Sequence, residues 1–260
     1  MEIWDPIYYS SNSSIQTENA VSLLKSSINF VKPCGSLLDI GCGDGKLTAE
    51  IVELLQSDFC VGVDLSQNMI DYAQSAYGNK KNIEFIADDV TKITYENMFD
   101  TITSFNCIHW VMNHNLLFDK IYCALKENGR TFILTYLRNN LFWEVIDELS
   151  LSPKWEKNFQ TLQNNFSTST LNDYQLILKK IGFKCWHISS VEKEEAFKNM
   201  SNFCDYIKGW LPHLAFLNKR QQIIFLDDFS NLYLNKNLGS CTFHYEQVNL
   251  IFEKPRETGS

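Results

Sequence analysis

Short apolar runs alternate with longer segments of helical periodicity between residues 37 and 136. The short runs predict strands, and the longer segments carry apolar residues at the spacing of a helix. We expect strands over 37–40, 60–64, 83–86, 101–105 and 131–136, and helices over 47–55, 68–77 and 115–126. The last of these helices precedes Asn128-Gly129, a typical C-cap. Such alternation predicts βαβ units and a parallel sheet with helices on both faces.

The pattern is less regular after residue 137. Two segments rich in aromatic residues predict helical insertions that form a lid, and between them a helix ends at Gly182. Strands over 185–191 and 242–252 complete a doubly wound, mainly parallel seven-stranded α/β sheet. We expect an N-terminal helical segment over 1–34 that contributes to the active-site cover, and a core over 35–137. Two lid insertions follow over 138–170 and 194–238. The remaining helix and strands of the sheet lie over 171–193 and 239–255.

Composition narrows the possible partners. The formal net charge is -8, which argues against a nucleic-acid partner held by a general basic patch. The eight cysteines form no Cys-x-x-Cys pair, so no metal site is predicted, and reduced structural thiols indicate a cytoplasmic protein. The chain starts without a secretory signal pattern, and no apolar run approaches the roughly 18–20 residues that span a bilayer.

A glycine-rich turn follows the first predicted strand. Residues 37–45 read Leu-Leu-Asp-Ile-Gly-Cys-Gly-Asp-Gly, and the third glycine stands one residue too early for a dinucleotide fingerprint. With Asp39 two residues before Gly41, the turn resembles motif I of class I S-adenosylmethionine (SAM)-dependent methyltransferases. The resemblance implies a Rossmann-like methyltransferase fold whose SAM-binding core is 35–137. It also implies that Gly41, Gly43 and Gly45 wrap the methionine part of SAM, with Asp39 facing its ammonium group.

The second strand ends in an acidic residue. Asp64 lies 23 positions after Gly41, where a carboxylate accepts hydrogen bonds from both hydroxyls of a ribose. The alternative role, capping the next helix, is already filled by Ser66. In the family pattern, Leu65 and Met69 lie against the adenine, although the spacing of Met69 fits a core position equally well.

A third motif lies at the end of the third strand. Residues 83–90, Ile-Glu-Phe-Ile-Ala-Asp-Asp-Val, resemble the family segment whose acid bonds the adenine amino group. The position four residues after the phenylalanine selects Asp89 over Asp88, with the backbone of Val90 reading the ring. Two adjacent acids at a strand end are also compatible with a solvated turn.

The fourth strand leads into a candidate substrate loop. Residues 99–110 resemble motif IV, which places Ser104 and Phe105 beside the reactive methyl group, and many relatives have Asn where this chain has Phe105. Ser104-Phe105-x-x-Ile-His109-Trp110 resembles the juvenile hormone acid methyltransferases of insects. Residues 8–16, with Ser11-Asn12-Ser13 and Gln16, resemble their N-terminal segment. Trp4-Asp5-Pro6 also resembles trans-aconitate methyltransferases, and both groups methylate a carboxylate.

Carboxylate methylation needs no general base, because the acid is ionised at neutral pH. The enzyme then has only to orient one oxygen toward the methyl group in a dry pocket. The resemblance assigns Gln16 and the indole N–H of Trp110 to the second carboxylate oxygen. His109 is a candidate base for a hydroxyl or amine acceptor, and the competing interpretation is a structural histidine.

The resulting hypothesis is a SAM-dependent methyltransferase acting on a small, predominantly apolar carboxylic acid, with S-adenosylhomocysteine as the second product. A malonyl-acyl-carrier-protein O-methyltransferase of biotin synthesis is the alternative enzyme, and it requires a basic surface around the lid. A SAM-binding partner protein without turnover is the alternative of another class. We expect a monomer or homodimer, with neither nucleic acid nor a membrane span involved.

Overall fold

A seven-stranded sheet forms the centre of the computed structural model, which describes residues 5–27, 35–162 and 166–256. The strand order is β3-β2-β1-β4-β5-β7-β6, and neighbouring strands from β3 to β5 are parallel. Strand β7 runs antiparallel to both β5 and β6. The strands are β1 (Ser36–Ile40), β2 (Phe59–Asp64), β3 (Ile83–Ala87), β4 (Phe99–Phe105), β5 (Leu125–Tyr136), β6 (Lys184–Ala196) and β7 (Thr242–Glu253). The predicted doubly wound, mainly parallel sheet is confirmed.

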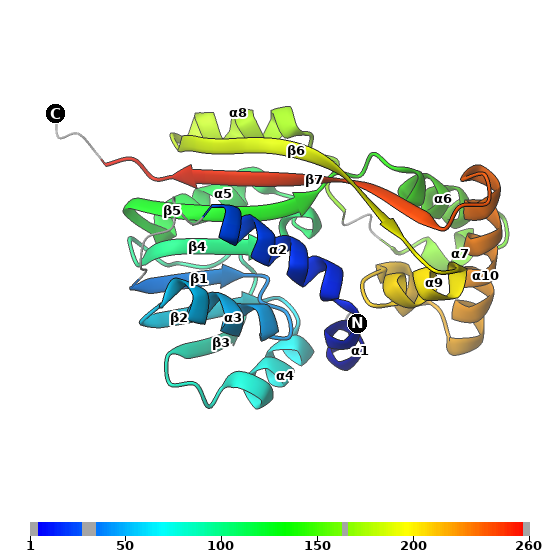
Figure 1. Cartoon of the computed structure of the whole chain (residues 1–260), viewed down its shortest axis with the longest axis horizontal. Helices are drawn as coiled ribbons and strands as arrows, with labels where there is room; N and C mark the ends of the chain where they lie inside the picture. The colour runs from blue at the N-terminus through cyan, green and yellow to red at the C-terminus, as the bar shows by residue number, and fades with distance from the viewer. Residues whose placement is uncertain (1–4, 28–34, 163–165, 257–260) are drawn as a thin grey trace.

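Helices cover both faces of this sheet (Figure 1). One buried cluster joins the sheet to α5 and α8, and a second joins its other face to α2, α3 and α4. A short helix, α1, precedes α2 and contacts α4. The bounds are α1 (Pro6–Asn12), α2 (Ser14–Ser26), α3 (Lys46–Leu55), α4 (Gln67–Tyr77), α5 (His114–Ala124) and α8 (Leu171–Ile181).

A separate helical layer lies beyond the carboxyl ends of the parallel strands, on the right in Figure 1. It consists of α6 (Leu141–Ser150), α7 (Glu156–Phe159), α9 (Met200–Lys208), the 3-10 helix η3 (Pro212–Phe216) and α10 (Lys219–Lys236). This cap, as we call it, has its own aromatic core, in which Phe142, Phe203 and Phe229 are fully buried. Strands β6 and β7 extend into it, and Phe243 on β7 packs 5.6 Å from both Phe142 and Phe203 between ring centroids.

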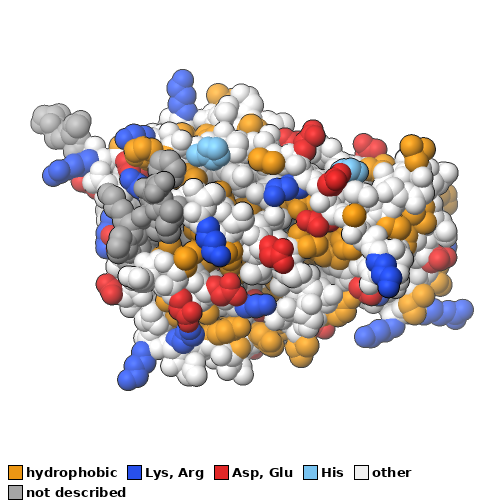
Figure 2. All heavy atoms as spheres, viewed as in Figure 1, with side chains coloured by type: hydrophobic (Ala, Val, Ile, Leu, Met, Phe, Trp, Pro, Cys, Tyr) orange, Lys and Arg blue, Asp and Glu red, His pale blue; other side chains and the backbone are white. Residues whose placement is uncertain are grey.

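The surface carries both signs of charge. Figure 2 shows lysines and arginines scattered over one face, with acidic side chains between them. Over the described ranges, no helix combines the length and the apolar character that crossing a bilayer requires. Trp4 and Cys34 lie outside the described residues.

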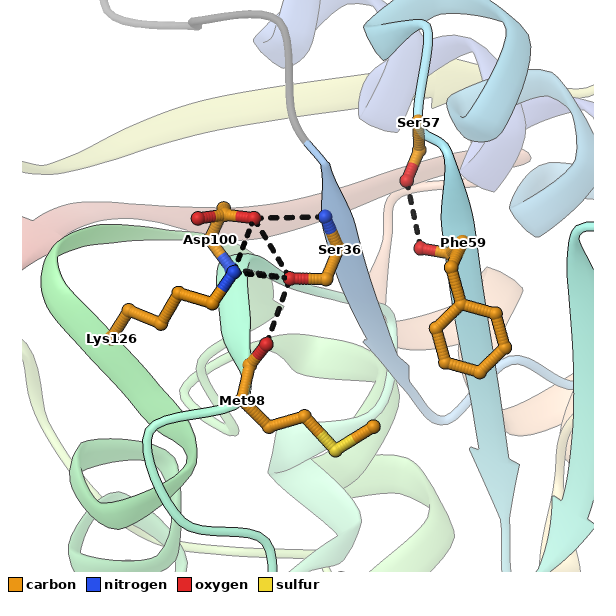
Figure 3. A network of polar contacts seen from close by, with 6 residues as sticks. All are labelled: Ser36, Ser57, Phe59, Met98, Asp100 and Lys126. Carbon is orange, nitrogen blue, oxygen red and sulfur yellow. Dashed lines mark hydrogen bonds and ion pairs between the residues drawn. The ribbon is translucent and has the colours of Figure 1, made fainter.

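A polar network joins β1, β4 and β5 at the edge opposite the cap (Figure 3). Asp100 on β4 accepts hydrogen bonds from the backbone N–H of Ser36 at 2.9 Å and from its hydroxyl at 2.8 Å. Lys126 on β5 donates to the same carboxylate at 2.9 Å. Since strands in a parallel sheet are not joined by tight turns, such contacts help to set their register.

One predicted boundary is wrong. The helix expected over 115–126 ends at Ala124, and Leu125 already pairs with Phe99 in the sheet. The Asn128-Gly129 pair therefore lies inside β5, where Asn128 has φ +60°. Its backbone N–H donates to the carbonyl of Lys254, the residue after β7, at 2.8 Å and not to a helix carbonyl as expected.

We predict that replacing Phe203 by Ala lowers the free energy of unfolding by about 3–5 kcal/mol, because it opens a cavity in the aromatic core of the cap. The control is Ile223→Ala on α10, whose side chain is 71% exposed, and it should change stability by less than about 0.5 kcal/mol. Urea unfolding of both variants measures the difference. Equal stability losses would contradict the assignment of a core to this layer.

Candidate active site

A cavity of about 500 Å³ lies where the parallel strands end and the cap begins. Its lining comes from the loops after β1, β2, β3 and β4, from the N-terminal helices and from the cap. Ligands of open α/β sheets bind at this edge, because the strand order reverses there and the loops diverge. Here the reversal lies between β1 and β4, and the loops after both strands line the cavity.

The loop after β1 has a backbone that favours glycine. Gly41, Gly43 and Gly45 have φ values of +74°, +54° and +77°, in the region that L side chains rarely adopt. A Cβ on Gly41 would overlap the side chain of Cys107, so this residue lets the loops after β1 and β4 touch. Gly43 differs: a Cβ would meet no atom within 4 Å, and the residue lines the cavity. Its open side leaves space for a ligand.

Gly45 is not a lining residue of the cavity, although the resemblance implied cofactor contact. A Cβ there would lie 2.8 Å from both the Ala73 Cβ and the Phe85 ring. Gly45 therefore allows α3 to begin close to α4 and β3. Packing of helix against sheet accounts for a glycine at this position, and contact of Gly45 with the cofactor stays a prediction.

Asp39 has a structural role in addition to its expected position facing an ammonium group, which stays a prediction. Its side chain is buried and does not line the cavity. The hydroxyls of Thr48 and Thr103 donate to its two oxygens at 2.6 and 2.7 Å. Burial raises the pKa of this carboxyl, and the two hydroxyls oppose that rise. Asp39 thus joins β1, α3 and β4 beneath the glycine loop and acts on it indirectly.

Asp64 reaches the cavity from the end of β2. Its Oδ2 accepts the N–H of Gly43 at 3.0 Å, and its Oδ1 accepts the N–H of Ser66 at 2.9 Å. Burial raises its pKa, and these backbone donors oppose the effect. The carboxylate links the two loops and keeps its remaining lone pairs for hydroxyl donors, which suits a ribose. As predicted by the sequence analysis, Ser66 caps α4 by accepting from Met69 N–H.

The expected adenine-side residues line one end of the cavity. Leu65 and Met69 both contribute to the lining, and Leu65 is 77% exposed whereas Met69 is buried. Asp88, Asp89 and Val90 line the same region. Asp89 Oδ1 is already bonded to Thr91, with the N–H at 3.0 Å and the hydroxyl at 2.7 Å. The selection of Asp89 over Asp88 stays a prediction.

The loop after β4 separates this end of the cavity from the cap. Phe105 lines the cavity, whereas Ser104 points inward and donates to the Ile40 carbonyl at 2.9 Å. Asn106, at φ +57°, accepts a hydrogen bond from the Tyr136 hydroxyl at 2.6 Å. Ser104 therefore stabilises the β1–β4 pairing, and Phe105 presents an apolar face to any ligand.

Gln16 reaches the cavity from α2. The side chain is only 7% exposed, and its Oε1 has no hydrogen-bond partner among the described residues. A buried amide oxygen without a partner costs free energy, so such a group in a cavity points to a bound polar ligand. Rotation of the amide presents either its oxygen or its N–H groups to that ligand.

His109 and Trp110 belong to a short 3-10 helix, η2 (Ile108–Trp110), in the loop after β4. Burial lowers the pKa of His109 to about 3, and His114 adds to that effect. Its Nδ1 lies 3.1 Å from the Thr135 hydroxyl. The ring is therefore neutral near pH 7 and a poor proton acceptor. Trp110 lines the cavity and stands against Phe166, with ring centroids 5.1 Å apart.

Aromatic side chains form much of the cavity wall. Four of them are tyrosines, from α1, β5, α9 and β7, and burial raises the pKa of each, so their hydroxyls keep their protons: Tyr9, Tyr136, Tyr206 and Tyr245. None of the four was selected from the sequence as a site residue, although Tyr9 lies in the N-terminal segment 8–16 that resembles the family. For Tyr136, its position at the end of the fifth predicted strand could have indicated that it lies in the site. Tyr206 and Tyr245 are far from any motif along the chain.

The charge of the lining is unusual for a site that takes an anion. Among the described residues, the charged side chains on its surface are Asp64, Asp88 and Asp89, and none is a lysine or arginine. All three lie on the side of the glycine loop. The cap side offers neutral donors and aromatic rings only. One end of the cavity therefore suits a cation with hydroxyl groups, and the other suits an apolar body.

This division fits SAM, which carries a ribose and positive charge. Gly43 provides open space beside the backbone, Asp64 accepts from hydroxyls, and Leu65 and Met69 offer an apolar surface to a base. The acidic residues suit a positively charged ligand better than a dinucleotide, because each phosphate would meet like charge.

Comparison with known proteins agrees with this geometry. Residues 37–129 match a family model described as a methyltransferase domain. The juvenile hormone acid O-methyltransferase of Drosophila melanogaster is 28% identical over 214 residues, which cover 78% of this chain and 72% of that protein. Malonyl-[acyl-carrier protein] O-methyltransferase 1 of Ilyobacter polytropus is 26% identical over 230 residues, 84% of this chain and 80% of that protein.

A solved structure shares the fold. Phosphoethanolamine N-methyltransferase 2 of Haemonchus contortus, in complex with S-adenosyl-L-methionine, superposes with a TM-score of 0.59 at 21% identity. The match covers 92% of this chain and 53% of that chain.

The two loop glycines give a matched pair of variants. Gly43→Ala should weaken binding of S-adenosylhomocysteine at least tenfold, because its Cβ occupies the open side of the loop. Gly45→Ala should mainly lower the free energy of unfolding, through the clash with Ala73 and Phe85. Backbone strain of about 1–2 kcal/mol is common to both variants. Calorimetric titration and urea unfolding separate the effects, and identical profiles for the two variants would refute the distinction.

Proposed function

Because the chain is a class I SAM-dependent methyltransferase, we propose that it methylates the carboxylate of a small organic acid with a predominantly apolar body. The observation that carries this proposal is the acceptor side of the cavity, which combines hydrogen-bond donors with aromatic walls and contains no effective base. When bound, SAM supplies an electrophilic methyl group, whose transfer to a carboxylate yields a methyl ester.

The protonation states favour an acceptor that is already ionised. A hydroxyl or ammonium acceptor has to lose a proton during transfer, and His109 is the histidine of the lining. Its pKa of about 3 makes it a weak base. Burial also raises the pKa of the Cys107 thiol to about 12. A carboxylate avoids the problem, since it carries its charge at neutral pH without help from the protein.

Neutral donors are suited to hold this carboxylate. The amide of Gln16, the indole of Trp110 and the protonated hydroxyl of Tyr206 all belong to the lining. A lysine or arginine at this position would neutralise the acid and lower its nucleophilicity. Neutral donors orient one oxygen and leave the other available, while the aromatic walls exclude water from the site.

The same features weaken the alternative acceptors. A di- or tricarboxylate requires several cations, and the described lining has none. Arg138, the arginine best placed in the sequence, forms two hydrogen bonds with Asp147 at 2.8 and 2.6 Å. A malonyl group on an acidic carrier protein requires a basic surface around the cap. On the face drawn in Figure 2, basic side chains are interspersed with acidic ones.

The role of the donors is testable by substitution. Gln16→Ala and Trp110→Phe should each lower kcat/KM for an accepted acid by about 10- to 100-fold, the loss of a hydrogen bond to a charged group. Affinity for S-adenosylhomocysteine should stay nearly unchanged. The controls are Gln74→Ala and Trp186→Phe, both outside the cavity. Transfer of a labelled methyl group to a panel of carboxylic acids measures the effect. Full activity of both site variants would overturn the assignment.

The pH profile distinguishes the two classes of acceptor. With a carboxylate, the rate should be flat from about pH 6 to 9, because His109 is neutral and the acid ionised throughout this range. His109→Asn should leave that profile flat. If the rate instead rises through an apparent pKa near 6.5 and is lost in the His109 variant, the acceptor is a hydroxyl or amine.

A further inference from the structure

A second chamber, of about 370 Å³, lies beside the main cavity. The two share Trp110, Trp143 and Phe166 in their linings. The rest of the second lining comes from Arg138 in the β5–α6 connection, from α6 and the residue after it, from α7 and the segment after it, and from η3. This chamber therefore lies largely within the cap. Nothing in the proposed methyl transfer uses the residues that belong to this chamber alone.

Arg138 is the first polar group of the chamber. Its side chain is 12% exposed, and its two terminal nitrogens are bonded to Asp147. The guanidinium also stands over the Trp143 ring, 4.9 Å from the centroid. The Nε–H, by contrast, is buried without a partner among the described residues. Guanidinium N–H groups only donate, so this position requires an acceptor.

His213 is the second polar group. It is 8% exposed, and its Nδ1 is likewise buried without a partner in the part of the chain that the structure describes. Phe159 stands edge-on to the imidazole at 5.2 Å and Phe225 lies parallel to it at 6.4 Å between centroids. Burial lowers the pKa of His213 to about 4, so the ring is neutral at pH 7. A neutral imidazole nitrogen forms one hydrogen bond as donor or acceptor, according to its tautomer.

The charges that line the chamber indicate whether its ligand is charged or uncharged. Arg138 and Asp147 compensate each other, and Glu156 adds one more negative charge to the lining. A second carboxylate would therefore meet a net negative environment. An uncharged oxygen avoids this repulsion, because it accepts a hydrogen bond without bringing charge into the chamber. Arg138 and His213 line the same chamber, and the guanidinium acts electrostatically on the imidazole. Burial of their two nitrogens without partners is costly, and an oxygen bound in this chamber would relieve that cost.

We propose that the second chamber is a specificity subsite for an uncharged oxygen, a hydroxyl or carbonyl, on the end of the acceptor remote from its carboxylate. Arg138 and His213 bind that oxygen, and Trp110, Trp143 and Phe166 contact the apolar body between the two polar ends. This inference rests on the proposed carboxylate methylation and adds the second polar end to the description of the acceptor.

The experiment uses matched acids that differ at the remote end. Decanoic, dodecanoic and tetradecanoic acids are compared with their ω-hydroxy derivatives and with the dicarboxylic acids of equal length. Initial rates of labelled methyl transfer give kcat/KM for each. At the length that fits, the ω-hydroxy acid should be preferred over the plain acid by at least tenfold, and the dicarboxylic acid should be disfavoured.

The variants Arg138→Met and His213→Phe should reduce that preference to about one. Arg256→Met and His244→Phe are matched controls on exposed positions, and the preference should survive in both. Since Arg138 also packs on Trp143, circular dichroism and S-adenosylhomocysteine binding verify that each variant is folded. The ratio of kcat/KM for two acids on one enzyme is insensitive to a general loss of activity. The His213→Phe variant also keeps the ring contacts with Phe159 and Phe225.

The outcomes are distinguishable. If acids are methylated but no ω-hydroxy acid is preferred at any length, the subsite is refuted and the methylation of carboxylates stands. A preference that persists in both site variants has the same consequence. If no acid in the panel is methylated while cofactor binding is intact, the proposed function fails and the subsite fails with it.

Discussion

The close approach of the loops after β1 and β4 is the constraint on which the site depends. Gly41 allows the backbone to pass against Cys107, and Gly43 donates to Asp64 from the neighbouring loop. Beneath them, Asp39 accepts from Thr48 and Thr103 and so joins the strand, the helix and the next strand. These contacts place the open side of the glycine turn and the carboxylate of β2 in one cavity, before any ligand arrives.

The cap turns this general cofactor cavity into a site for a particular acceptor. Its aromatic core is independent of the sheet core, and its inner face contributes rings and hydroxyls without any lysine or arginine among the described lining residues. In an apolar cavity of this kind, electrostatic interactions are strong and unpaired charges are costly. In the methyl transfer that we propose, the cationic cofactor is the counter-charge of the acceptor carboxylate, and neutral side chains orient it.

The sequence predicted the sheet well, because buried parallel strands read as short apolar runs with glycine or acidic residues at their ends. The helix before β5 was predicted too long, because Asn128-Gly129 favours a turn both at a helix end and within a strand. Only the strand pairing shows that this pair lies inside β5. Asp39 and Gly45 have packing roles in the structure, which a sequence pattern cannot distinguish from ligand contact. Tyr206 on α9 and Tyr245 on β7 were not selected, because tertiary packing rather than local spacing brings them to the cavity.

The most direct test of the account offers the enzyme two acceptors with the same apolar body, dodecanoic acid and dodecan-1-ol, together with labelled SAM at pH 7.5. Mass spectrometry distinguishes the methyl ester from the methyl ether. The account predicts the ester alone, at a rate that falls in the Gln16→Ala variant. Formation of the ether in preference to the ester would contradict it, because the cavity would then have to contain a base that its protonation states exclude.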